Sequence, residues 1–151
     1  MALDDDIRIL SAVGLFEGFT QEQLRLLAFG AENTFLQADR KLYLEDDDAD
    51  SAYIVVKGRI ALYREQGGER IPIGMAGPGA MLSELALIAD TRRLTSASAA
   101  IDSEVIRLSR KMFRRILEEY PDLAVQLHER ILEEFQQMIA RIEELGPRFT
   151  G

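Results

Sequence analysis

The spacing of apolar side chains changes twice along the chain and divides it into three regions. In residues 1–30 apolar positions recur at helical steps, as Ile7 and Leu10 do. In residues 31–108 short apolar runs alternate with polar residues between turn signals, which is the pattern of short strands. In residues 109–145 the three- and four-residue steps return. The pattern predicts one α+β domain over all 151 residues, with a β-structure between two helical segments.

The middle region predicts many short strands joined by turns. The Gly-Gly pair in "EQGGER", Glu65 to Arg70, is typical of a hairpin turn. Gly58 ends one run, and "AGPGA", residues 76–80, is a loop of turn residues. This number of short strands favours a closed or double-layered β-structure. The predicted strands are "KLYL", "AYIVV", "RIALYR", "RIPIGM", "TSASA" and "EVIRL".

Capping residues and prolines predict where the helices begin and end. Thr20 opens a helix in the first region, and Ser109 caps the first helix of the last region. Pro121 interrupts that region, and a final helix is predicted from Asp122 to about Leu145. Its length is roughly 34 Å at about 1.5 Å per residue.

The final helix carries an apolar stripe at three- and four-residue steps. Such a stripe either packs against the helix's own domain or forms a seam between two copies of the chain. From its length we favour a homodimer through this helix. The stripe consists of Ala124, Leu127, Ile131, Phe135, Met138, Ile142 and Leu145.

Composition and charge exclude several classes of function. The net charge of −8 leaves no large basic face for direct DNA binding. No apolar stretch reaches membrane-spanning length, the N-terminus lacks the pattern of a secretory signal, and there is no cysteine. We therefore expect a cytoplasmic protein without disulfides. The one histidine, His128, lies among charged residues of a helix, so we predict no metal site, no cofactor and no enzymatic activity.

The acidic run "EDDDAD", residues 45–50, has the spacing of the first ligands of a calcium loop. The rest of that motif is missing, since Ser51 replaces its glycine and Lys57 its bidentate glutamate. We predict a solvated acidic turn between two strands.

The segment "GPGAMLSELALIADTRRLTSASA", residues 77–99, has the features of a phosphate site. A Gly-rich turn leads into a short helix from about Ser83, whose first N–H groups would face outward. Arg93 could return to the same place and bind phosphate oxygens through charge-assisted hydrogen bonds. Glu84 would accept a hydrogen bond from a sugar hydroxyl, because a carboxylate beside phosphate is repulsive.

This segment resembles the phosphate-binding cassette of the cyclic nucleotide-binding domain family. That family includes catabolite-activator-type transcription factors and protein kinase A regulatory subunits. "KLYLEDDDADSAYIVVKGRIALYRE" and "SEVIRLSRKMFRRILEEYPDLAVQL" are similar to the family's strand and helix segments on either side. The resemblance covers nearly the whole chain. It implies an eight-stranded, jelly-roll-like antiparallel β-roll, or double-stranded β-helix, flanked by N-terminal helices and a long C-terminal helix.

The resemblance assigns roles within the cassette. Glu84 matches the ribose-binding glutamate and Arg93 the phosphate-binding arginine, while Leu85 and Ala86 supply N–H groups. Tyr53 and Gly58 match residues that shape the β-roll. The complete set of predicted ligand-binding residues is Ser83, Glu84, Leu85, Ala86, Arg93, Leu94 and Thr95.

The cassette also departs from the family pattern. Ser83 replaces a glycine, Arg92 a proline, and the bulky Leu94 a small residue. Asp39 and Asp46 replace common turn glycines. A second interpretation therefore stays open, in which Glu84 and Arg93 form an internal salt bridge and no nucleotide binds.

The resemblance implies a regulatory module that binds cyclic AMP or cyclic GMP and signals through movement of its C-terminal helices. One alternative is a dimerisation module that no longer binds nucleotide. Another is the sensor part of a catabolite-activator-type regulator without its DNA-binding domain. We favour a stand-alone chain, because its start resembles a natural one, Gly146-Pro147 stops the final helix and no recognition helix follows.

Overall fold

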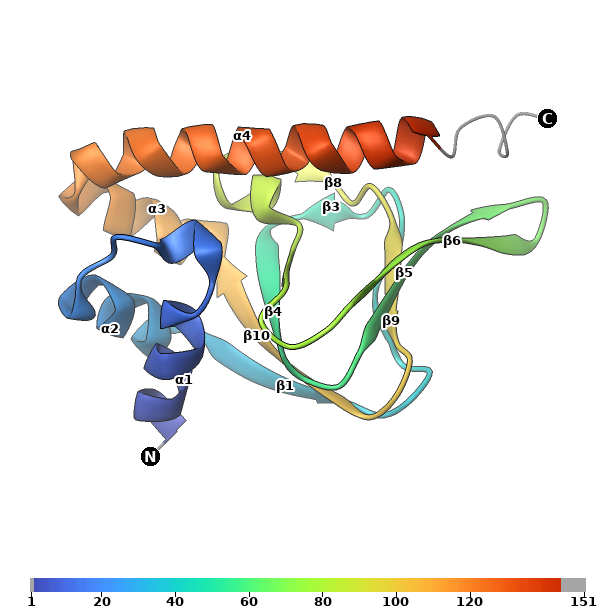
Figure 1. Cartoon of the computed structure of the whole chain (residues 1–151), viewed down its shortest axis with the longest axis horizontal. Helices are drawn as coiled ribbons and strands as arrows, with labels where there is room; N and C mark the ends of the chain where they lie inside the picture. The colour runs from blue at the N-terminus through green and yellow to red at the C-terminus, as the bar shows by residue number, and fades with distance from the viewer. Residues whose placement is uncertain (1, 145–151) are drawn as a thin grey trace.

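The computed structural model describes residues 2–144. The shorter α-helices gather at one end of the molecule, and the longest helix extends from that end across the strands (Figure 1). The helical elements are α1 (Ala2–Ser11), η1 (Gly14–Phe16), α2 (Gln21–Gly30), η2 (Glu84–Leu87), α3 (Arg110–Glu119) and α4 (Pro121–Glu144). The strands are β1 (Glu32–Leu36), β2 (Lys41–Tyr43), β3 (Asp48–Ala49), β4 (Ser51–Lys57), β5 (Ile60–Gln66), β6 (Glu69–Ala76), β7 (Met81–Leu82), β8 (Thr91–Arg92), β9 (Ser96–Ala99) and β10 (Ser103–Ser109).

Two helices begin at the residues that the sequence predicts. The Thr20 hydroxyl accepts from the Gln23 backbone N–H, and the Gln23 side chain accepts from the Thr20 N–H, which is a complete capping box. The Ser109 hydroxyl accepts from the Met112 N–H at 3.2 Å and caps α3. These bonds satisfy backbone donors that have no partner within a helix.

The strands form an antiparallel β-roll flanked by helices, as expected. One sheet has the order β1-β10-β4-β7 and the other β2-β9-β5-β6, and a two-stranded ribbon pairs β3 with β8. The expected eight strands correspond to the two sheets, and the ribbon adds two more within the described residues. Gly67 and Gly68 both have positive φ in the β5–β6 hairpin, which confirms the Gly-Gly turn.

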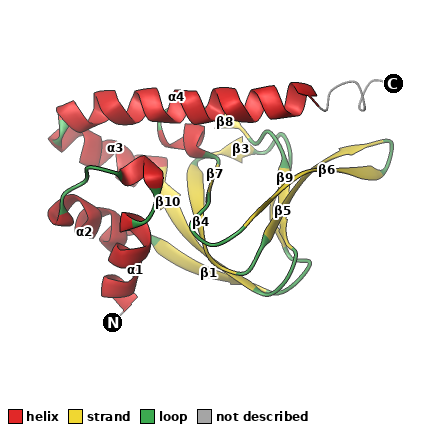
Figure 2. Ribbon diagram, viewed as in Figure 1, coloured by secondary structure: helices red, strands yellow, loops and turns green. Residues whose placement is uncertain are grey.

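Strand β4 is buried on both faces, which explains its continuous apolar run. Ile54 belongs to the core between the first sheet and the helices. Its neighbour Val55 belongs to the core between the two sheets. The result is three layers, with helices, the first sheet and the second sheet in that order (Figure 2).

The prediction was wrong in several details. Strand β1 was not among the predicted runs, and β3, β7 and β8 have two residues each, too few to show a period. The acidic run is a turn only as far as Asp47, because Asp48 already belongs to β3. The final helix begins at Pro121 instead of Asp122. Its predicted end at Leu145 lies outside the described residues.

The apolar stripe of α4 packs mainly against the chain itself, which corrects its interpretation as a dimer seam. Leu127 and Ile131 are fully buried in the core beneath the helices. Met138 and Ile142 pack against the core between the sheets. Helix α4 lies along the whole molecule and covers both the helical end and the β-roll (Figure 1). The apolar side chains that α4 leaves exposed are others, Val125 and Leu132.

In residues 2–144 no helix is long and apolar enough to cross a bilayer.

Candidate functional site

The predicted short helix is η2, which lies between β7 and β8. Ser83 precedes it in the left-handed region, with φ 62° and ψ 43°. Its carbonyl accepts the Ala86 N–H at 3.0 Å and so starts the helical turn. Glycine adopts this conformation readily, whereas any side chain at the position is strained. Asp39 and Asp46 also have positive φ, at the two other places where the family has turn glycines.

We expect Ser83→Gly to increase the free energy of unfolding by about 1 kcal/mol, because it relieves the left-handed strain. Part of this gain is offset by the greater freedom of glycine in the unfolded chain and by the loss of the Ser83 hydroxyl. Urea denaturation measures the change. Ser83→Ala is the matched control, since it removes the hydroxyl but keeps the strain. Equal stabilities of the two variants would contradict this explanation.

A cavity lies beside η2, between the cassette, the β-roll and α4. Six of the seven predicted ligand-binding residues line it, and Arg93 is the exception. Phe135 and Met138 of α4 also line it. The lining residues are Tyr43, Ala49, Leu62, Leu82, Ser83, Glu84, Leu85, Ala86, Thr91, Arg92, Leu94, Thr95, Phe135 and Met138.

Arg93 is buried next to this cavity, with 4% of its surface exposed. Its Nη1 donates to the Ser51 carbonyl at 2.7 Å, and Nη2 donates to the Ser51 hydroxyl at 3.3 Å. The guanidinium lies over the ring of Tyr43 at 4.5 Å and near that of Tyr53 at 5.5 Å. Its Nε has no acceptor among the described residues.

Glu84 is half-buried at the cavity wall, and the loss of hydration there raises its pKa to about 7. The charge of Glu134 on α4 adds to the increase, while the Glu84 backbone N–H opposes it. Glu84 and Arg93 form no ion pair among the ion pairs of residues 2–144. The salt bridge on which the second interpretation depended is therefore not formed in this structure.

The remaining predicted residues differ in what they offer a ligand. The Ala86 N–H is already bonded to Ser83, so it is not free as the resemblance implied. The Leu85 N–H makes no hydrogen bond within the described residues. Thr95 is buried on the wall, whereas Leu94 presents an apolar surface to the cavity.

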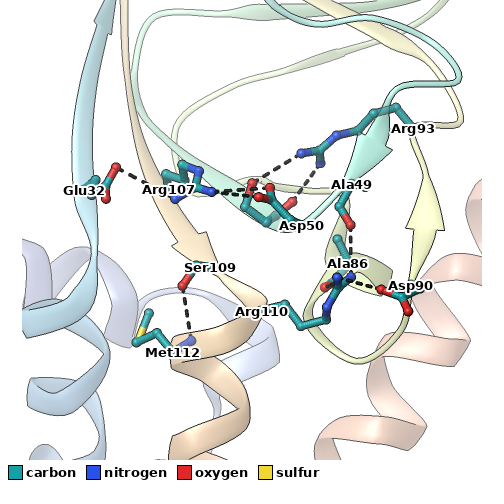
Figure 3. A network of polar contacts seen from close by, with 11 residues as sticks. Glu32, Ala49, Asp50, Ala86, Asp90, Arg93, Arg107, Ser109, Arg110 and Met112 are labelled. Carbon is teal, nitrogen blue, oxygen red and sulfur yellow. Dashed lines mark hydrogen bonds and ion pairs between the residues drawn. The ribbon is translucent and has the colours of Figure 1, made fainter.

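Arg110, the first residue of α3, links that helix to the cassette, and the sequence analysis missed it. Its Nη1 donates to the carbonyls of Ala49 at 3.0 Å and Ala89 at 2.8 Å. Its Nη2 lies 2.7 Å from the Asp90 carboxylate. Figure 3 shows how this side chain reaches from α3 to both segments. The only sequence signal was an arginine directly after the Ser109 cap.

Three arginines hold the three consecutive residues from Ala49 to Ser51, which we call the anchor segment. Arg110 binds the Ala49 carbonyl, Arg107 binds the Asp50 carboxylate at 3.3 Å, and Arg93 binds Ser51. The Arg110 backbone N–H also donates to the Asp50 carbonyl at 2.8 Å. The cassette, β10 and α3 therefore meet at one short stretch of backbone (Figure 3).

No cluster of metal-ligating side chains occurs within the described part of the chain. His128 is exposed on α4, as expected.

Comparisons with known proteins point to one family. The model of the family described as "Cyclic nucleotide-binding domain" matches residues 34–120. Neuropathy target esterase sws of Drosophila persimilis is 34% identical over 94 residues, which are 62% of this chain and 7% of that protein. The chain thus spans a small fraction of the length of the curated relatives that it matches.

Two solved structures are also similar. A cyclic nucleotide-binding-like protein from Brucella abortus is 61% identical, with a TM-score of 0.70, over 76% of this chain and 99% of that one. The regulatory domain of Toxoplasma gondii PKA with cAMP is 21% identical, with a TM-score of 0.71, over 85% of this chain and 50% of that one. The second likeness concerns the fold alone.

Proposed function

The chain belongs to the cyclic nucleotide-binding domain family, and on this basis we propose that it is a non-catalytic sensor that binds cyclic AMP or cyclic GMP. The ligand would lie in the cavity beside η2, and binding would be transmitted through α3 and α4. The sensor would act in the cytoplasm without a cofactor.

Arg93 carries this proposal. A buried cation is costly unless a charged partner compensates it. Arg93 has no carboxylate partner among the described residues, and its Nε lacks an acceptor. A phosphodiester anion would supply both the opposite charge and the acceptor.

Glu84 supports a sugar partner for the same ligand. A carboxyl group with a pKa near 7 is one that the fold buries without a compensating cation. A ribose hydroxyl would donate to it and replace the hydration that it has lost. The apolar side chains of Leu94, Phe135 and Met138 on the cavity wall suit the flat face of a base.

The anchor segment supports a route for the signal. Arg93 and Arg110 bind residues two apart, so a ligand that engages Arg93 acts close to the contact of α3. Arg110 also holds the carbonyl of Ala89 in the cassette. A shift of the anchor segment or of the cassette would therefore change the position of α3, and with it that of α4.

Isothermal titration of the folded protein with cyclic AMP and cyclic GMP tests the proposal. We expect saturable binding of one or both at a single site. Absence of heat and of thermal stabilisation at millimolar nucleotide would exclude this function.

A dimerisation module is the second candidate, and the exposed side of α4 favours it. Val125 is 63% exposed and Leu132, seven residues later, is 39% exposed. Ile139 continues the same spacing and is half-buried. Residues seven apart lie along one side of a helix, so these three would meet their copies in a second chain.

We expect a dimer at tens of micromolar, which Leu132→Glu converts to a monomer, because it places a charge in the seam. Sedimentation velocity measures the mass. Glu133→Gln changes charge on the adjacent exposed position and should leave the dimer intact. A wild-type monomer at these concentrations would contradict the proposed seam.

A further inference from the structure

Tyr43 contacts both Arg93 and the residue that precedes η2. Its ring lies against the Arg93 guanidinium, with 4.5 Å between the guanidinium carbon and the ring centroid. Its hydroxyl oxygen accepts from the Ser83 hydroxyl at 3.3 Å, at the start of η2. The Tyr43 side chain thus contacts two parts of the cassette, Arg93 and the start of η2.

Tyr43, and not Arg93, forms part of the cavity wall. Tyr43 lines the cavity, and so do Arg92 and Leu94, the sequence neighbours of Arg93. Arg93 itself does not line it, although its side chain is adjacent. The aromatic ring therefore contacts both the cationic group and the space that a ligand would enter.

The contacts of Tyr43 are favourable in themselves. A cation over an aromatic face is attracted to the ring, and the attraction is stronger when both groups are shielded from water. Tyr43 is 9% exposed and its ring also packs against that of Tyr53, with 5.9 Å between centroids. Burial raises the pKa of the Tyr43 hydroxyl, so the group stays neutral.

The strand that carries Tyr43 pairs with its sheet over a short and irregular stretch. Strand β2 has three residues and lies at the edge of its sheet. Its pairing with β9 is irregular between Lys41 and Tyr43. A short edge strand with a broken register is held by few ladder hydrogen bonds.

We infer that Tyr43 is an internal occupant of the phosphate position, which must turn away before an anion can reach Arg93. This inference rests on the proposed function for the identity of the ligand. In the free protein Tyr43 therefore closes the phosphate position. The apparent Kd equals the Kd of the open state divided by the fraction of molecules that are open.

Removing the ring should tighten binding. We expect Tyr43→Ala to lower the Kd for cyclic AMP by about tenfold, the factor that corresponds to one cation–π contact. We also expect it to create binding of inorganic phosphate at millimolar concentration. Both gains should disappear in the double variant Tyr43→Ala, Arg93→Ala. Isothermal titration measures the Kd of the wild type, the single variant and the double variant at the same salt concentration.

Two further variants distinguish the role of Tyr43 from a general effect of removing a buried side chain. Tyr43→Phe keeps the ring and removes only the bond to Ser83, so we expect normal stability and about a threefold lower Kd. Tyr63→Ala is the matched control, because Tyr63 is also buried and faces another arginine, Arg70, at 4.2 Å. It should leave the affinity for cyclic AMP unchanged.

The outcomes separate this inference from the proposed function. Equal or weaker binding of both probes by Tyr43→Ala and Tyr43→Phe overturns the role of Tyr43, and the proposed function stands if cyclic AMP still binds. Arg93-dependent binding of phosphate by Tyr43→Ala, without any binding of cyclic nucleotides, supports the role of Tyr43 and overturns the nucleotide function. No binding of either probe by any variant overturns both.

Discussion

Arg93→Ala is expected to weaken cyclic nucleotide binding by about 100-fold or more. The substitution removes the buried cation that would pair with the phosphodiester and its charge-assisted hydrogen bonds. Hydrogen bonds to charged groups contribute about 1.5–3 kcal/mol each, and about 2.7 kcal/mol corresponds to a factor of 100. Isothermal titration with the nucleotide that binds the wild type measures the loss.

The adjacent arginine provides the matched control. Arg92 also lines the cavity, but it is exposed and donates to the Asp46 carbonyl at 3.2 Å, so Arg92→Ala should weaken binding far less than Arg93→Ala. Arg93→Lys keeps the charge but loses the planar fork, and an intermediate affinity is expected. Since Arg93 also holds Ser51, thermal denaturation of each variant confirms folding. Unchanged affinity in folded Arg93→Ala would exclude Arg93 as the phosphate ligand.

Glu84→Gln is expected to stabilise the protein at pH 8 by about 3 kcal/mol, the free energy equivalent of the difference between the folded and unfolded pKa. Burial raises the pKa of Glu84 from 4.5 to about 7. Between these values the folded state binds more protons than the unfolded state, so stability falls as the pH rises. The penalty is complete above pH 7 and absent below about 4.5.

The pH dependence distinguishes this explanation from a simple change of packing. Urea denaturation from pH 4.5 to 8 should give a smaller decline in stability for Glu84→Gln than for the wild type. The charge of Glu134 on α4 is a smaller cause of the raised Glu84 pKa than burial, so Glu134→Gln should reduce the effect of Glu84 only in part. Glu129→Gln, at an exposed position of α4, is the control for charge alone. Parallel curves for wild type and Glu84→Gln would contradict the burial argument.

The order of the main elements could be predicted because local signals decide it. The Thr20 capping box, the Ser109 cap and the Gly67-Gly68 turn each act within a few residues. The left-handed conformation of Ser83 was also foreseeable, since it stands where the family has glycine. Strands of two residues carry no such signal, because pairing with a distant strand alone defines them.

The sequence predicted which residues lie at the site, but not which side chains they contact. Which side chains would gather at the cavity followed from the cassette, and six of the seven line it. The direction of Arg93 depends on Tyr43 and Ser51, which are more than 40 residues earlier in the chain. Glu84 meets Glu134, 50 residues later, through the packing of α4. Such pairings arise from the tertiary structure and leave no local pattern.

The anchor segment makes three arginines thermodynamically dependent on one another. Substitutions at separate sites usually have additive effects, whereas residues that share a partner do not. Arg93, Arg107 and Arg110 all hold residues 49–51, so the loss of one loosens the segment on which the other two depend. The stability of a double variant will therefore differ from the sum of the single ones. The size of that difference gives a direct measure of how strongly the cavity and α3 are coupled.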